Sequence, residues 1–233
     1  ALLKWVKLSR ECDMIHTTTY NSAIPASLIS LFSGKKVVLT VHEIFWKLWY
    51  RFLGWKWFFF KLFESIIFKF PFDKIICVSN YTKNSLRIHF GIVDKKLSTV
   101  YNGIDYKRWD KNNFKVKDIK KIQEKYNLNK SFSWLYFWRP GISKGLEYFI
   151  FALPGIVKKI KNFKAVLIVS ENDKKRVAFI KSLICDLKVE EFVEWVSSVD
   201  NKELGNYILA CDFVVVPSLV EWFGFSAAET CAL

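Results

Sequence analysis

The sequence predicts an α/β protein of two lobes, each a parallel sheet that helices cover on both faces. Short, continuously apolar segments alternate with amphipathic helical patterns along nearly the whole chain, and this alternation is typical of parallel strands buried on both faces. One lysine-rich polar stretch, residues 107–130, interrupts the pattern. The length of 233 residues suits two modest domains. We therefore expect Rossmann-like lobes at 1–106 and 131–233, with 107–130 as a linker.

The first lobe is expected to hold four strands, at 13–16, 35–42, 74–79 and in the first part of the segment 97–105. The segment KKVVLTVH at 35–42 is nearly all apolar or β-branched, which favours a buried strand. Helices are expected at 22–32 and 80–90, the second ending at Gly91, and an Asn102-Gly103 turn follows the last strand.

The second lobe repeats the pattern with strands at 133–138, 164–170, 192–196 and 212–217, and helices at 146–160, 174–187 and 201–210. One short helix, VKDIKKIQEKY, is expected in the linker. In open parallel sheets ligands bind beyond the carboxyl ends of the strands, so residues there are the first candidates for a site. Because the chain opens at Ala1 without a methionine and stops at ETCAL, we expect an internal fragment with both lobes incomplete.

Composition limits the class of protein and its partners. Five scattered cysteines without a CxxC pair argue against a disulfide framework or a zinc site and indicate a reducing cytoplasm. The formal charge of +14 calls for a polyanionic partner, either nucleic acid, an anionic membrane or a phosphorylated substrate. No apolar run approaches the ~20 residues of a spanning helix.

Two strand ends carry side chains suited to a ligand. TVHE places His42 after a strand of the first lobe, and RPGISKG places Arg139 and Lys144 between a strand and a helix start. The second arrangement can bind phosphate, because arginine grips its oxygens with a planar fork and lysine adds a point charge. The alternative is that both are ordinary surface cations. The loop matches neither the P-loop nor the dinucleotide fingerprint.

A third strand end, VVVPSLVEWFGFSAAET, carries two carboxylates eight positions apart, Glu221 and Glu229. Ser226 and Glu229 form an S-x-x-E capping box, which is a purely structural reason for Glu229. Glu221 follows Pro217 in an aromatic loop away from any helix, where a carboxylate can accept hydrogen bonds from the hydroxyls of a sugar or ribose.

These pieces together resemble retaining glycosyltransferases of the GT-B fold, in particular glycosyltransferase family 4. The resemblance rests on TVHE, VSNYTKNSLRIHFGI, VYNGID, the R-x4-K of RPGISKG and the E-x7-E of the last segment, which occur in family order over residues 13–233. It implies transfer of a hexose, with retention, from a UDP- or GDP-sugar to a glycan or a lipid-linked acceptor. No D-x-D motif occurs, and the resemblance implies a transfer that needs neither metal nor cofactor.

The resemblance also implies roles for individual residues. Arg139 and Lys144 would hold the donor diphosphate and stabilise the leaving group, and His42 would lie near the reaction centre across the cleft. Glu221 would bind the hydroxyls of the transferred sugar, and Glu229 the ribose. The remaining donor contacts would come from Val199, beside the nucleobase, and from the backbone of Phe223, Gly224 and Phe225.

Four tryptophans stand where the family pattern leads us to expect glycine: Trp46, Trp57, Trp138 and Trp222. Ser197 replaces a fifth expected glycine. The chain holds 10 Trp and only 9 Gly, whereas average usage of about 7% glycine corresponds to roughly 16. We hypothesise that some of these tryptophans are UGA codons that the source organism reads as glycine. If they are genuine, we expect the indoles at 138 and 222 to obstruct the donor.

Residues 45–70 mix aromatic side chains with lysine and arginine. Charges recur too often for a spanning helix but suit a helix lying in a membrane interface, which would make the protein peripheral on the inner face of the cell membrane. The alternative is a helix pair that packs in the core with its lysines solvated.

Two other classes of function fit part of the sequence. A non-catalytic basic module that binds membrane or nucleic acid explains the charge but not the ordered strand-end motifs, and no recognised nucleic-acid-binding motif occurs, so no nucleic acid is expected. A sugar-nucleotide epimerase of similar two-lobed fold fits less well, because of the R-x4-K and E-x7-E motifs.

The glycine hypothesis predicts the residues of the natural protein. Mass spectrometry of peptides from the source organism should find glycine at positions 138 and 222. Tryptophan at both positions would end the hypothesis.

Overall fold

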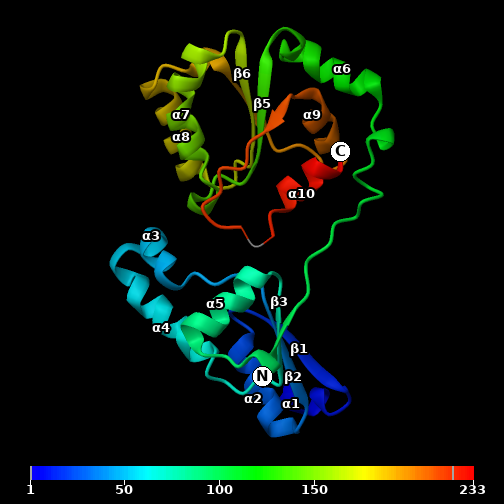
Figure 1. Ribbon diagram of the computed structural model, residues 1–233, viewed down its shortest axis with the longest axis vertical. Helices are drawn as coiled ribbons and strands as arrows, with labels where there is room; N and C mark the ends of the chain where they lie inside the picture. The colour runs from blue at the N-terminus through cyan, green and yellow to red at the C-terminus, as the bar shows by residue number, and fades with distance from the viewer. Residues whose placement is uncertain (1, 222) are drawn as a thin grey trace. The chain divides into compact units, whose positions relative to one another are not determined.

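Figure 1 shows the computed structural model, which describes residues 2–221 and 223–233. The chain divides into two compact units, Ala1–Gly103 and Ile104–Leu233. Each unit contains a sheet of four strands, and all the strand pairs are parallel. The predicted α/β class with two Rossmann-like lobes is confirmed.

In the first unit the strands follow one another across the sheet in chain order: β1 (Met14–Thr18), β2 (Lys36–Val41), β3 (Lys74–Cys77) and β4 (Leu97–Thr99). The helices are α1 (Leu2–Ser9), α2 (Ala23–Ser33), α3 (Trp49–Leu53), α4 (Trp57–Ile67) and α5 (Asn80–Phe90). α5 has the predicted bounds, because Ser79 caps its start and Gly91, with φ +66°, ends it. The strand expected in the first part of 97–105 ends at Thr99, and α1 was not predicted.

A buried carboxylate organises the loop that follows β2. Glu64, on α4, is fully buried and accepts hydrogen bonds from the backbone N–H groups of Phe45 (2.9 Å) and Trp46 (2.8 Å) and from the Tyr20 hydroxyl (2.7 Å). Burial raises the pKa of Glu64, while these donors oppose the shift. Trp46 has a φ of +43°, which is rare for a bulky residue. This backbone suits the glycine that the family pattern leads us to expect there.

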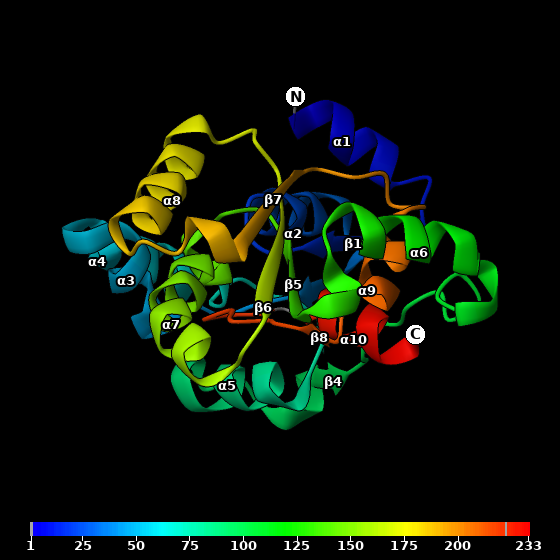
Figure 2. The same cartoon turned by 90° about the horizontal axis from the view of Figure 1, so that it is seen from above.

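In the second unit the strand order is β7-β6-β5-β8, formed by β5 (Phe132–Trp138), β6 (Phe163–Val169), β7 (Val193–Ser197) and β8 (Phe213–Val214). The helices are α6 (Val116–Lys125), α7 (Leu146–Lys159), α8 (Lys174–Asp186), α9 (Leu204–Ala210) and α10 (Phe225–Ala232). In Figures 1 and 2, α7 and α8 cover one face of the sheet, and α6, α9 and α10 lie on the other. Two separate apolar clusters fill these faces.

The order of the strands places a topological switch between β5 and β8. The chain passes from β5 outward to β6 and β7, and then returns to the other side of β5 as β8. The loops after β5 and β8 therefore lie side by side, and the N–H of Leu219 donates to the carbonyl of Ser143 (2.8 Å). Open α/β sheets bind ligands at such a point.

In each unit an aspartate just before a strand fixes the register of that strand against its neighbour. Asp212 accepts a hydrogen bond from the N–H of Ser133 (2.8 Å) and donates its own N–H to the Ser133 carbonyl (3.0 Å). Asp73 makes the same pair of bonds with Val37 in the first unit. β8 itself pairs with β5 only at Phe213 and Val214, so it is shorter than the strand predicted at 212–217.

Residues 107–130, expected to form a linker, pack against the second unit. Trp109 and Leu128 are buried in its core. The ring of Phe114 lies so close to Gly205 on α9 that no Cβ fits there. The division between the two units falls at Gly103–Ile104.

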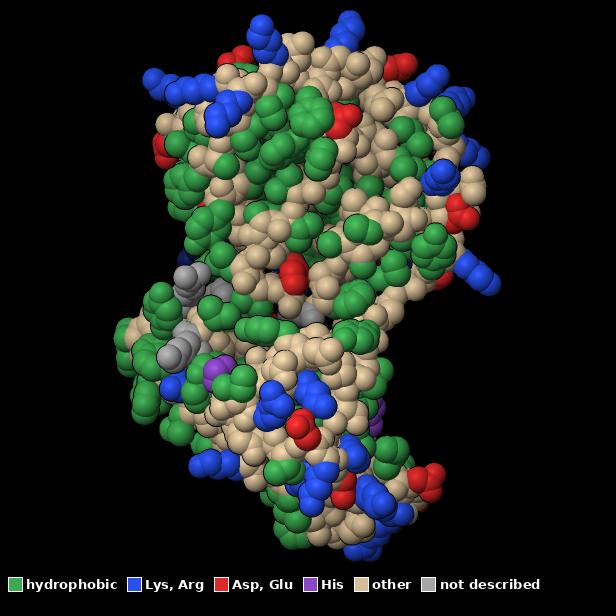
Figure 3. All heavy atoms as spheres, in the orientation of Figure 1, with side chains coloured by type: hydrophobic (Ala, Val, Ile, Leu, Met, Phe, Trp, Pro, Cys, Tyr) green, Lys and Arg blue, Asp and Glu red, His purple; other side chains and the backbone are tan. Residues whose placement is uncertain are grey.

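Residues 45–70 form a helix pair, α3 and α4, that leaves much apolar surface exposed. Trp55, Phe58, Phe59, Leu62 and Ile66 are each at least 40% exposed. Figure 3 shows hydrophobic side chains gathered over these helices. The two helices are therefore not packed entirely in the core, because their outer face is exposed. Within the described part of the chain, no helix combines the length and apolarity needed to cross a bilayer.

Candidate functional site

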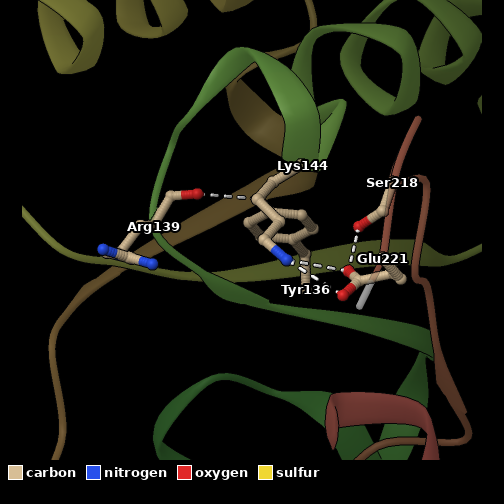
Figure 4. A network of polar contacts seen from close by, with 5 residues as sticks. All are labelled: Tyr136, Arg139, Lys144, Ser218 and Glu221. Carbon is tan, nitrogen blue, oxygen red and sulfur yellow. Dashed lines mark hydrogen bonds and ion pairs between the residues drawn. The ribbon is translucent and has the colours of Figure 1, made fainter. Parts of the chain in front are cut away.

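The loops after β5 and β8 are joined by an ion pair between Lys144 and Glu221. The lysine Nζ lies 2.9 and 3.0 Å from the two carboxylate oxygens. Ser218 donates to the same carboxylate (2.5 Å), as Figure 4 shows. The two charged side chains are only 14% and 25% exposed, so water screens this pair less than a surface pair.

The backbone of the first loop is held close to the second. The buried Tyr136 hydroxyl donates to the carbonyl of Arg139 (3.3 Å), and burial raises the pKa of Tyr136. Gly145, with φ +64°, ends the turn that carries Lys144, and a Cβ there would collide with the carbonyl of Pro217. Only glycine satisfies both the left-handed backbone and this close approach.

Arg139 is placed between two neighbouring cavities. One, of about 430 Å³, is also lined by Val199, Phe225 and Glu229. The other, of about 400 Å³, is lined by Lys144. In Figure 4 the guanidinium of Arg139 points away from the Lys144–Glu221 pair. The structure thus brings Arg139 and Glu229 to one cavity and Lys144 and Glu221 into contact, and Arg139 borders both regions.

The capping box predicted for Ser226 and Glu229 is wrong. α10 begins at Phe225, and its N-cap is Gly224, with φ +83° and no side-chain cap bond. Ser226 lies buried inside the first turn, so its side chain cannot act as the cap. Glu229 lines the 430 Å³ cavity instead. Burial raises the pKa of Glu229, and the nearby charge of Arg108 opposes the shift.

Two residues near Glu229 were not singled out from the sequence. Arg108 donates to the backbone carbonyl of Asn201 (3.1 Å), and Asn201 lines the same cavity. Arg108 lies three residues after the VYNGID motif, in a lysine-rich stretch, so nothing local distinguishes it from a solvated cation.

The start of α10 faces the same region. The side chains of Phe223 and Phe225 contact each other, with ring centroids 5.1 Å apart, and Gly224 between them is buried. The first N–H groups of a helix have no partner within the helix, so they are free to meet an anion or an oxygen atom.

Trp138 occupies the space between the two cavities and lines both. The Nζ of Lys144 lies 4.3 Å from the centre of its indole ring, a cation–π contact. Its buried Nε1 has no hydrogen-bond partner within the described residues, which is unfavourable for a buried donor. An indole therefore lies where we expected glycine.

The other predicted glycine positions differ among themselves. Trp57, at the start of α4, has the ordinary helical φ of −52° and needs no glycine. Ser197 ends β7 and is exposed. Trp222 lies outside the described residues.

His42 belongs to the first unit, where it follows β2 and is half-buried. Burial lowers the pKa of His42, which favours the neutral imidazole. Of the described His, Cys, Asp and Glu side chains, no three gather closely enough to share a metal ion.

Comparison with known proteins gives two family matches. Residues 1–108 match the model described as Glycosyltransferase Family 4, and residues 118–233 match that of Glycosyl transferases group 1. An uncharacterized glycosyltransferase of Methanocaldococcus jannaschii is 28% identical over 166 residues, which are 68% of this chain and 40% of that protein.

Solved structures show the same fold. HepE of Anabaena, in complex with UDP, superposes with a TM-score of 0.80 at 19% identity, covering 99% of this chain and 60% of that one. The same protein has also been solved with UDP-glucose. Sucrose-phosphate synthase of Thermosynechococcus elongatus gives a TM-score of 0.78 at 20% identity, covering 98% of this chain and 57% of that one. The chain thus spans about 60% of the length of these structures.

The close approach at Gly145 can be tested with two glycines of the same helix, Gly145 at the N-cap of α7 and Gly155 within it. Gly145→Ala should lower the free energy of unfolding by about 2–5 kcal/mol, because it combines a left-handed backbone with a steric collision. Gly155→Ala, in an exposed turn of α7 with open space around it, should raise it by about 0.5–1 kcal/mol. Urea denaturation measures both changes. Equal effects at the two positions would contradict the packing described.

Proposed function

From the premise that this chain belongs to the family 4, group 1 glycosyltransferases with the GT-B fold, we propose that it transfers a hexose from a nucleotide-diphosphate sugar. The observation that carries the proposal is the gathering of cations and carboxylates at the switch between β5 and β8, where Lys144 pairs with Glu221 and Arg139 lines one cavity with Glu229. The sugar diphosphate of such a donor carries both the negative charge and the hydroxyls that these side chains recognise.

The 430 Å³ cavity is proposed to take the nucleoside of the donor. Its lining includes the apolar side chains of Phe137, Ile168 and Val199. Glu229 supplies a carboxylate to which ribose hydroxyls can donate. A UDP- or GDP-sugar placed in this way would direct its diphosphate toward Arg139, which borders the second cavity.

Arg139 and Lys144 are proposed to bind the diphosphate and to stabilise the charge that develops as it leaves. Lys144 can turn from Glu221 toward a phosphate, because an ammonium has three donors on a flexible stem. Glu221 then accepts hydrogen bonds from hydroxyls of the transferred sugar. The amides at Phe223, Gly224 and Phe225 complete the donor site. With two cations on the leaving group, the proposed transfer requires no metal ion and no cofactor.

The acceptor is proposed to be a glycan or a lipid-linked molecule, and the transfer to retain the anomeric configuration through attack on the same face of the sugar. Glycosyl transfer with retention is described for one solved neighbour, trehalose-6-phosphate synthase. His42 is proposed to serve the reacting sugar as a neutral hydrogen-bonding group.

The proposed donor site can be tested with the native protein, that is, the protein with the residues that mass spectrometry finds at 138 and 222. A screen of UDP- and GDP-sugars should find one that is hydrolysed or transferred. Lys144→Met should lower kcat by about 10²–10³-fold, the usual loss when one donor to a developing anion is removed. Lys158→Met, at the exposed end of α7, is the matched control and should leave the rate unchanged. Unchanged activity in Lys144→Met would refute the assignment.

An anionic membrane surface is proposed as a further partner of the first unit. The exposed aromatic side chains of α3 and α4 lie among lysines, including Lys56 and Lys69. Aromatic side chains can enter the headgroup region while lysines pair with lipid phosphates.

Vesicle co-sedimentation tests this partner with the whole chain. Binding to vesicles that contain phosphatidylglycerol should exceed binding to phosphatidylcholine vesicles and should weaken as salt rises. Replacing Phe58 and Phe59 with serine should lower the bound fraction several-fold, whereas Phe151→Ser, an exposed phenylalanine on α7, should not. Absence of binding at low salt would remove the membrane from the proposal.

A further inference from the structure

Arg176, on α8, is joined to the loop that carries Arg139 and Lys144. Its Nε donates to the carbonyl of Pro140 (2.8 Å). Its Nη2 forms an ion pair with Oε2 of Glu147, in the first turn of α7, at 2.6 Å. One arginine thus connects the loop to both helices of this face of the sheet.

The pair of Arg176 and Glu147 is well shielded from water. The two side chains are 16% and 13% exposed, compared with about half for the pair of Lys181, on the same helix, and Glu171, which precedes the helix. A shielded ion pair is screened less by salt than an exposed one, and removing one partner leaves the other charge uncompensated. The close Nη2–Oε2 contact lacks the geometry of a linear hydrogen bond, so its strength is mainly that of paired charges.

The arginine is itself held in place at both ends. Its backbone N–H donates to Oδ1 of Asp173, the residue that caps α8 (3.0 Å). Its guanidinium carbon lies 4.9 Å from the centre of the Phe179 ring. Because the side chain is already ordered, little entropy is lost when it holds the loop.

Two consecutive carbonyls at the start of the loop accept hydrogen bonds from side chains, one from the buried Tyr136 and one from the partly buried Arg176. Tyr136 donates to the carbonyl of Arg139, and Arg176 donates to that of Pro140. The last part of the loop is tied differently, by the backbone bond from Leu219 to Ser143. Arg176 therefore supplies the link between the first part of the loop and the helices behind it.

Arg176 does not line the cavity that Arg139 and Lys144 share, although Pro140 and Asp173 do. Its charge is neutralised by Glu147, so it acts on a ligand through the position of the loop and not as a second phosphate cation. We propose that Arg176 is a positioning residue that sets the affinity of the site for the second phosphate of a nucleoside diphosphate. This inference rests on the donor site proposed above.

Calorimetric titration of the native protein with UDP and UMP, and with GDP and GMP, tests the inference. For the base that the native protein binds, Arg176→Met should weaken diphosphate binding by about 10- to 100-fold, because a displaced loop no longer presents its cations. Binding of the monophosphate should change by less than about twofold. Lys181→Met on the same helix should change neither constant. Arg176→Lys keeps a charge beside Glu147 but lacks the fork that reaches Pro140, and it should show the same selective loss even if Arg176→Met fails to fold.

The outcomes separate this inference from the function on which it rests. If Arg176→Lys binds the nucleoside diphosphate and the monophosphate as the native protein does, the positioning role is wrong while the donor site stands. The same holds if its affinity for the two nucleotides falls equally. If the native protein binds neither UDP nor GDP, the proposed function is overturned, and the positioning role with it. A loss confined to the diphosphate, with unchanged thermal stability in Arg176→Lys, supports the role.

Discussion

The ion pair between Lys144 and Glu221 depends on the strand order and loop packing of the whole second unit. It joins residues 77 positions apart, and it forms only because β8 lies beside β5 with its register set by Asp212. Gly145 allows the two loops to approach closely, because a Cβ at this position would collide with the carbonyl of Pro217. Any change that moves these loops apart therefore separates the cation from the carboxylate.

A second pair of charges, Arg176 and Glu147, is joined to the same loop through the carbonyl of Pro140. Both pairs are largely shielded from water, but Lys144 lines a cavity where it can meet a ligand, whereas Arg176 does not line that cavity and holds backbone. The two pairs have different requirements. A cation that exchanges its carboxylate for a ligand needs mobility, whereas the loop that carries this cation needs rigidity.

Much of the fold could be predicted from the sequence, because apolar periodicity and caps are local. α5 has the bounds predicted from the segment 80–90 and from Gly91 at its end, and most other elements differ by one or two residues. Predictions failed where a local motif competed with tertiary packing. Ser226 belongs to a formal capping box, yet Gly224 is the N-cap and Glu229 turns to a cavity. The alternation of 45–70 did not reveal which aromatic side chains stay exposed.

The sequence by itself determined the fold class, the order of the strand-end motifs and the family to which they belong, because these depend on residue type and spacing. Only the tertiary structure decided that Lys144 meets Glu221, that Arg139 shares a cavity with Glu229, and that Arg176 lies behind the loop. The physical reason is that these contacts join different strands and helices. Strand order and register bring them together, and no local pattern in the chain encodes either.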